Sequence, residues 1–101
     1  MENLTIISTS ITVQATQQIE GNTANFTWNH LQGELPFAVN FNVQRGIPGS
    51  ENFTGNNFVT GAFYPETNKY DFNNNDLQPG DEDLYMPILA VCKGIVQEIE
   101  S

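Results

Sequence analysis

The alternation of apolar and polar side chains over residues 37–44 constrains the fold of this chain most strongly. Its apolar members are Phe37, Val39, Phe41 and Val43, and small or polar residues separate them. Successive side chains of a β-strand point to opposite faces, so this period of two predicts a strand with one face packed and the other in water. Residues 10–15 and 24–29 repeat the pattern. We therefore expect antiparallel strands throughout and no helix.

Clusters of turn-forming residues divide the chain into about seven such strands. Turns are expected at residues 20–22, 33–36, 46–57 and 77–80, where Gly, Pro and Asn gather. Further strands are expected at 57–64, with a bulge or bend at Gly61, and at 69–72, 84–92 and 95–99; residues 4–7 form either a separate short strand or the start of the first one. Residues 84–92 are apolar on both faces, as in a central strand, although Pro87 would remove a ladder donor there.

The fold class predicted from these segments is all-β, as a single domain over residues 1–101. An antiparallel sandwich of about seven strands fits the regular spacing of turns, and a small β-barrel is the alternative.

The second half of the chain also resembles a fibronectin type III or related immunoglobulin-like domain. Leu77-Gln78-Pro79-Gly80 matches the corner between two strands of that family, Tyr85 matches its corner tyrosine, and Ala90-Val91 matches the end of the following strand. Trp28 resembles the tryptophan of its second strand. The acidic insert Asp81-Glu82-Asp83 departs from the family pattern and displaces the tyrosine by two positions. The resemblance implies a two-sheet sandwich with a binding or spacer role and no catalytic residues.

The charge of the chain excludes several classes of partner. The formal net charge is −9, and Arg45, Lys69 and Lys93 are the only basic residues. Such a surface repels nucleic-acid phosphates and anionic membranes. The start of the sequence lacks the basic and apolar regions of a signal peptide, so we expect a protein made in the cytoplasm and incorporated into a virion or another assembly.

The inventory of reactive residues does not favour an enzyme. His30 is the only histidine, Cys92 is the only cysteine, and neither a Gly-x-Ser-x-Gly motif nor a phosphate-binding glycine loop is present. Cys92 lies in an apolar run, where we interpret it as a small buried hydrophobe. We predict no catalytic residue and no cofactor.

One acidic segment invites a calcium hypothesis, because oxygen ligands occur there at spacings that partly match an EF-hand loop. The candidate ligands are Asp71, Asn73, Asn75, Asp76, Asp81, Glu82 and Asp83. Asp76 stands where an EF-hand needs glycine, and no flanking helices are expected. A solvated polar loop is the interpretation that we favour.

Four aromatic residues lie in segments rich in Asn and Thr: Phe53, Phe58, Tyr64 and Tyr70. Exposed aromatic rings beside amides stack on sugars or anchor protein interfaces, whereas buried ones fill a core. We favour core positions and keep the four as binding candidates.

These observations favour a non-enzymatic structural or interaction module that belongs to a larger assembly, such as a phage virion or a bacterial surface or injection structure. The expected partners are other protein subunits, or a second copy of the chain, bound at the exposed edges of the first and last strands. The alternatives are a carbohydrate-binding module and a calcium-binding adhesion domain.

Overall fold

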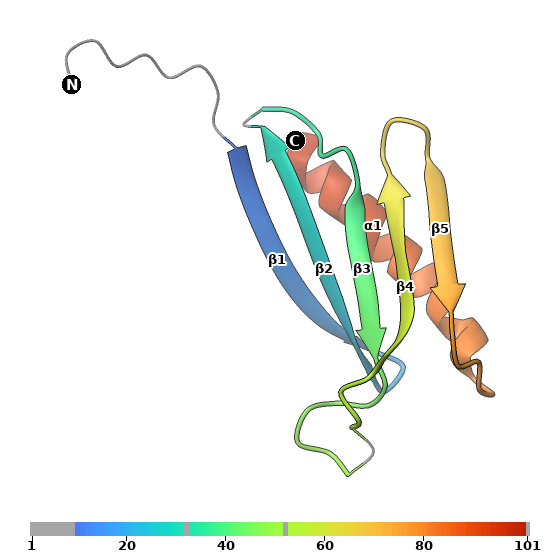
Figure 1. Cartoon of the computed structure of the whole chain (residues 1–101). Coiled ribbons are helices and arrows are strands. Elements are labelled where there is room, and N and C mark those ends of the chain that lie inside the picture. Colours follow the sequence, from blue (N-terminus) through green and yellow to red (C-terminus); the bar gives the residue numbers. More distant parts are fainter. Residues whose placement is uncertain (1–9, 32, 52, 101) are drawn as a thin grey trace.

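The computed structural model describes residues 10–31, 33–51 and 53–100 (Figure 1). Five strands precede a short 3-10 helix and a C-terminal α-helix. They are β1 (Ser10–Ile19), β2 (Asn22–Leu31), β3 (Val39–Gln44), β4 (Asn57–Tyr64), β5 (Lys69–Asn74), η1 (Asp81–Leu84) and α1 (Tyr85–Glu100). The strand predictions over residues 10–15, 24–29, 57–64 and 69–72 are confirmed, and the one at residues 4–7 lies outside the described residues.

The strands form a single antiparallel sheet in chain order, β1-β2-β3-β4-β5. Neighbouring strands are joined directly, as the turn signals of the sequence require. The tightest connection is Glu20-Gly21, with φ of 50° and 75°. Two residues with positive φ make a type I′ turn, whose twist matches that of the flanking strands.

Helix α1 crosses one face of this sheet diagonally from β5 toward β2 (Figure 1). The pairing register places the apolar residues of successive strands on that face: Phe26 lies opposite Phe41, and Trp28 lies opposite Val39. The buried core between helix and sheet contains Ile19, Ala24, Phe26, Trp28, Val39, Phe41, Val43, Phe58, Val59, Phe63, Leu84, Ile88, Cys92 and Val96. Burial of each large side chain stabilises the fold by roughly 1.5–3 kcal/mol.

Gly61 allows β3, β4 and β5 to pack closely. A Cβ atom at Gly61 would lie 2.0 Å from the carbonyl oxygen of Asp71 and 2.6 Å from Cζ of Phe41. The Phe41 ring therefore occupies the space that a side chain would need. The bulge expected at Gly61 is found elsewhere, because the β3–β4 register shifts between Val43 and Gln44.

The strands predicted at 84–92 and 95–99 are wrong, because Leu84 ends η1 and the other residues of both stretches belong to α1. Leu84, Ile88, Cys92 and Val96 recur every fourth residue and are between 0 and 8% exposed. This spacing forms one stripe of a helix, and the stripe packs on the sheet. The neighbouring apolar residues are only partly buried, so the run that resembled a central strand is an amphipathic helix.

Pro87 is compatible with this helix because it is the third residue of α1. Backbone N–H groups in the first turn have no partner within a helix, so a missing donor costs little there. The difficulty that Pro87 posed for a strand is thereby explained.

The corner expected at residues 77–80 is a loop that leads into η1. Leu77, the first residue of this expected corner, is 74% exposed, and Tyr85, the expected corner tyrosine, begins the helix. Phe37 was assigned to the buried face of a strand, but it precedes β3 and is 82% exposed. The described residues form five strands in one sheet, and neither a second sheet nor the predicted sandwich or barrel is found among them.

Candidate functional site

No other described element covers the face of the sheet opposite α1, called here the open face, and this face carries short polar side chains. The pairing register aligns Thr16, Asn25, Asn42 and Thr60 in one row across four strands. Strands β1 to β4 contain no Asp, Glu, Lys or Arg. In a chain with a net charge of −9, the charged side chains of the described residues thus lie in the turns and loops, in β5 and in the C-terminal helices. The open face is polar and uncharged over most of its width.

Hydrogen bonds between side chains hold part of this face in place. The Asn25 amide donates to Oδ1 of Asn42 at 3.1 Å and to Oε1 of Gln44 at 3.3 Å. The hydroxyl of Thr16 donates to Oδ1 of Asn25 at 2.9 Å, and the Gln44 amide donates to the carbonyl oxygen of Gly55 at 3.1 Å. The network joins β1, β2 and β3 and orients their amide groups.

Strand β1 forms one edge of the sheet. Among the described residues it has a neighbouring strand, β2, on one side only. Its ten residues contain no proline and no charge, and their pairing with β2 runs without a shift from Ser10 to Ile19. Natural sheets usually protect their edges with charges, prolines or bulges. The β1 edge has none of these.

The β1–β2 turn determines which backbone groups of β1 are free. Ile19 and Asn22 flank the two-residue turn and therefore form a hydrogen-bonded pair. Such pairs alternate along an antiparallel ladder, so every second residue directs its N–H and C=O away from β2. These residues are Ser10, Thr12, Gln14, Thr16 and Gln18. Their side chains lie on the open face, where they are exposed.

The opposite edge, β5, is better protected. It has six residues and carries Lys69 and Asp71. The hydroxyl of Tyr70 donates to the carbonyl oxygen of Tyr85 at 2.8 Å, which fastens β5 to the start of α1. Burial raises the pKa of Tyr70. Tyr70, a binding candidate in the sequence, therefore has a structural role.

Two other aromatic candidates lie inside the fold or against it. Phe58 is 3% exposed, and the guanidinium carbon of Arg45 lies 3.7 Å from the centre of its ring. Phe53 is partly buried beside Gly55, in the loop before β4. Neither ring is presented as an open stacking platform.

Tyr64 is the aromatic candidate that lines an accessible pocket. Its ring meets that of Phe37 edge to face, with the ring centres 5.7 Å apart. Glu66, Thr67 and Lys69 complete the lining of a pocket of about 240 Å³. Sequence reasoning assigned Phe37 to the core and so missed this pair, although Phe37 directly follows the turn expected at residues 33–36.

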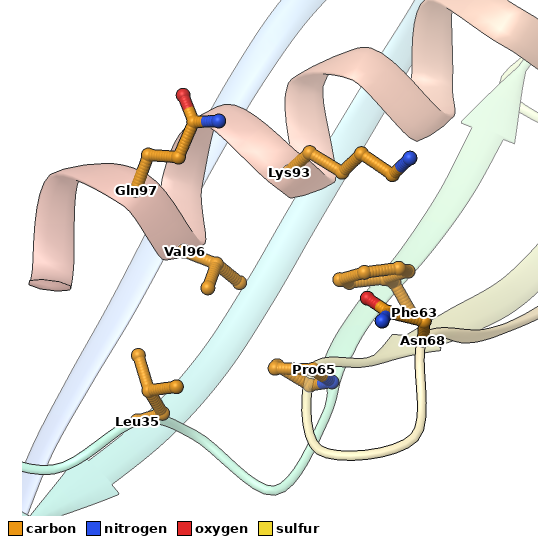
Figure 2. A pocket seen from close by; sticks show the side chains of 7 residues that line it. All are labelled: Leu35, Phe63, Pro65, Asn68, Lys93, Val96 and Gln97. Carbon is orange, nitrogen blue, oxygen red and sulfur yellow. The ribbon is translucent and has the colours of Figure 1, made fainter.

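A second pocket of about 290 Å³ lies between the C-terminal half of α1 and the nearby loops (Figure 2). Val96 and Phe63 face it from the helix and from β4, and Leu35 and Pro65 face it from the loops. Lys93 is the charged residue among its lining side chains. The lining holds no carboxylate, imidazole, hydroxyl or thiol that could act as a base beside Lys93, which makes this pocket a poor candidate for catalysis.

The residues of the calcium hypothesis are engaged in other ways or dispersed. Asp81 is 4% exposed and accepts two hydrogen bonds from Arg45, at 3.1 and 3.0 Å. It also accepts hydrogen bonds from the Asn74 amide at 3.1 Å and from the backbone N–H of Gln78 at 2.9 Å. Asp71 and Asn73 lie on β5, whereas Glu82 and Asp83 lie in η1.

Within the described parts of the chain, no three His, Cys, Asp or Glu side chains are grouped so as to hold a metal ion. Calcium binding by the acidic segment stays the less favoured hypothesis, and Asp81 would have to leave Arg45 to take part in it.

His30 and Cys92, the only histidine and the only cysteine of the chain, are both held in the fold by their surroundings. Nδ1 of His30 lies 2.9 Å from the carbonyl oxygen of Glu34 and 3.1 Å from that of Leu31. Cys92 is fully buried, as the sequence predicted, and burial raises the pKa of its thiol to about 12. A buried thiol with this pKa is not a thiolate at neutral pH and is a poor nucleophile.

Comparisons with models of protein families, with curated protein sequences and with solved structures find no match. In the part of the chain that the structure describes, none of the helices has the length and apolar composition to cross a bilayer. The geometry of the β1 edge and of the open face therefore carries the functional argument.

Proposed function

We propose that this chain is a non-enzymatic interaction module that binds a protein partner by adding a strand to the free edge of β1. An extended partner would satisfy the outward N–H and C=O groups of β1 and continue the sheet. The observation that carries this proposal is a ten-residue edge without charge, proline or bulge. Soluble proteins rarely leave such an edge open, because it recruits other strands.

The distribution of charge supports the same surface. This chain has 12 Asp and Glu residues. Their carboxylates repel those of another acidic protein wherever the two sets face each other. Glu20, Glu34 and Glu51 lie in turns, and three more acidic residues form the start of η1. Strand β1 is free of this repulsion over its whole length.

The small size of a one-strand contact supports a role in a larger assembly. Each added backbone hydrogen bond stabilises the contact by about 0.5–1.5 kcal/mol net, and a single strand buries less than the roughly 1,000 Å² expected of a stable binary interface. Such a contact becomes strong when many copies act together. A phage virion or a bacterial surface or injection structure is the kind of assembly that we propose.

The proposal is tested with two lysine variants that carry the same added charge. Gln14→Lys places it in the middle of the free edge, and Asn40→Lys places it on the exposed face of the inner strand β3. The particle size of each protein is measured in gentle lysates of the native source. We expect the wild type and Asn40→Lys in particles well above the 11.2 kDa monomer and Gln14→Lys as the monomer. A wild-type protein that is monomeric and unaccompanied in that source contradicts the proposal.

A second candidate function, carbohydrate binding, is favoured by the pocket beside Phe37. This ring is 82% exposed and is braced by Tyr64, so its outer face is free for stacking. The Glu66 carboxylate, the Thr67 hydroxyl and the Lys69 ammonium are hydrogen-bonding groups suited to sugar hydroxyls. At about 240 Å³, the pocket is smaller than the ~300–1,000 Å³ of sites for drug-sized ligands, so it suits a single ring.

Affinity electrophoresis through polysaccharide gels tests this candidate. Phe37→Ala removes the stacking face, and Met86→Ala, at a residue 63% exposed on α1, is the control for loss of an apolar surface side chain. Retardation that is lost in Phe37→Ala and retained in Met86→Ala supports sugar binding. Two results would contradict sugar binding at Phe37. One is equal mobility of the wild type with and without every polysaccharide tried, and the other is a retardation that is unchanged in Phe37→Ala.

A further inference from the structure

We propose that the strand added to β1 is the β1 strand of a second copy, paired about a twofold axis that passes through Gln14. This inference rests on the function proposed above and names its partner. Two five-stranded sheets would then continue into one sheet of ten strands.

The backbone of β1 is complementary to itself in this arrangement. With Gln14 opposite Gln14 of the other copy, Thr12 lies opposite Thr16, and Ser10 lies opposite Gln18. All of these residues direct their N–H and C=O groups toward the free edge, as the register with β2 requires. The pairs are therefore hydrogen-bonded pairs along the whole overlap.

The side chains on the open face also match. A glutamine amide offers both donors and acceptors, so two Gln14 side chains can bond each other across the axis. Threonine opposite threonine is a favourable cross-strand pair. The amide and hydroxyl network of Thr16, Asn25 and Asn42 then continues across the junction.

The face that α1 covers leaves room for the second copy. Ala15 and Gln17 lie on this face but are exposed, and Ile11 and Val13 are only half-buried. Figure 1 shows α1 crossing the sheet from β5 toward β2. Strand β1 is the next strand outward, and the helix does not cover it. Pairing would place Val13 opposite Ala15 and Ile11 opposite Gln17, and it would bury apolar surface that the monomer leaves in water.

Charge favours a second copy over an arbitrary acidic or basic segment. A segment with charged side chains would have to place them beside the ten residues of β1. None of these residues has a side chain of opposite charge that could pair with them. The β1 strand of another copy brings no charge into the contact. Glu20, the nearest acidic residue along the chain, lies in the turn beyond the paired stretch.

Disulfide trapping of purified protein tests the pairing. Opposite residues of a hydrogen-bonded pair have Cα atoms about 5.5 Å apart, within the roughly 4.4–6.8 Å that a disulfide spans. We expect Gln14→Cys to form a linked dimer of twice 11.2 kDa under mild oxidation. A mixture of Thr12→Cys and Thr16→Cys should link preferentially as the heterodimer. The native Cys92 is buried and serves as the internal control for thiol exposure.

Asn40→Cys is the matched control for random collision, because residue 40 is exposed on the open face away from the edge. A Gln14→Cys variant that stays monomeric, or that links no faster than Asn40→Cys, overturns the pairing of two copies. If Gln14→Lys nevertheless releases the protein from its native assembly, the strand-addition function stands and the partner is a different protein. If neither variant has an effect, both proposals fail.

Discussion

The guanidinium of Arg45 donates two hydrogen bonds to the carboxylate of Asp81, with N–O distances of 3.1 and 3.0 Å. Arg45 follows β3, and Asp81 begins η1, so the pair ties the sheet to the C-terminal helices across 36 positions of sequence. Arg45 also donates to the carbonyl oxygen of Asp76 at 2.9 Å and lies against the ring of Phe58. Bidentate pairs of this kind are both strong and geometrically specific.

Removal of Arg45 is expected to destabilise the protein substantially. Asp81 is 4% exposed, so Arg45→Ala leaves a buried carboxylate without its counter-ion, which costs about 3–5 kcal/mol. Lys69→Ala is the matched control, because Lys69 and Asp71 are 4.0 Å apart and largely solvated, and such pairs contribute about 0–1 kcal/mol. Urea unfolding measures both free energies. Equal losses in the two variants would show that the Arg45 pair is no stronger than a surface pair.

The same pair gives the stability a dependence on acid pH. The hydrogen bonds from Arg45 are the largest cause that holds the pKa of Asp81 below its ordinary value of 3.8, and those from Gln78 and Asn74 act in the same direction. A carboxylate with a lowered pKa in the folded state stabilises that state above the ordinary value, and this stability is lost as the pH falls through the folded-state pKa. Melting temperatures of the wild type and Asp81→Asn should therefore converge below pH 3.8. A constant gap between them contradicts this linkage.

Two glycine substitutions should have opposite effects. Gly61→Ala forces a methyl group against the backbone of Asp71 and the ring of Phe41, and we expect a loss of about 1–3 kcal/mol or more. Gly94→Ala lies within α1 and meets no atom within 4 Å, so the better helix propensity of alanine should stabilise by up to about 1 kcal/mol. Thermal unfolding followed by circular dichroism compares them. A Gly61→Ala protein as stable as Gly94→Ala would show that β4 and β5 are not as close as described.

Cys92 should be unreactive in the folded protein. Its side chain is fully buried, and its thiol pKa is raised to about 12. Alkylation by iodoacetamide is therefore expected to proceed only as fast as the protein opens, and to accelerate when urea is added. Gln97→Cys, at an exposed residue of the same helix, supplies a thiol that reacts without opening. Equal alkylation rates for the two thiols would place Cys92 at the surface.

The sequence predicted all five strands of the described chain, and local alternation indicated β1, β2 and β3 among them, because the covered face of a sheet demands an apolar residue at every second position. It could not distinguish the last element, since an apolar run fits a buried strand as well as a helix. The spacing of Leu84, Ile88, Cys92 and Val96 was the signal that favoured the helix. Among the described strands β1 is an edge, as expected of the first strand, whereas the expected last strand at 95–99 is part of α1.

Contacts between distant segments could not be predicted from local pattern. Nothing near Arg45 indicates that Asp81 is its partner, and the acidic residues around Asp81 suggested a metal site instead. Phe37 was placed in the core by its position in the alternation, but β3 begins only at Val39, and the ring of Phe37 stays outside. Side chains in loops follow the path of the chain, which the alternation does not determine.

Hydrogen exchange along β1 tests the central claim, that this strand is a free edge that recruits another strand. In dilute protein, the amides of Val13, Ala15 and Gln17 should be protected by β2, whereas those of Thr12, Gln14 and Thr16 exchange rapidly. As the protein concentration rises, the second set should become protected and the alternation should disappear. Rapid exchange of that set at every concentration, in the native assembly as well as in the purified protein, would contradict the account.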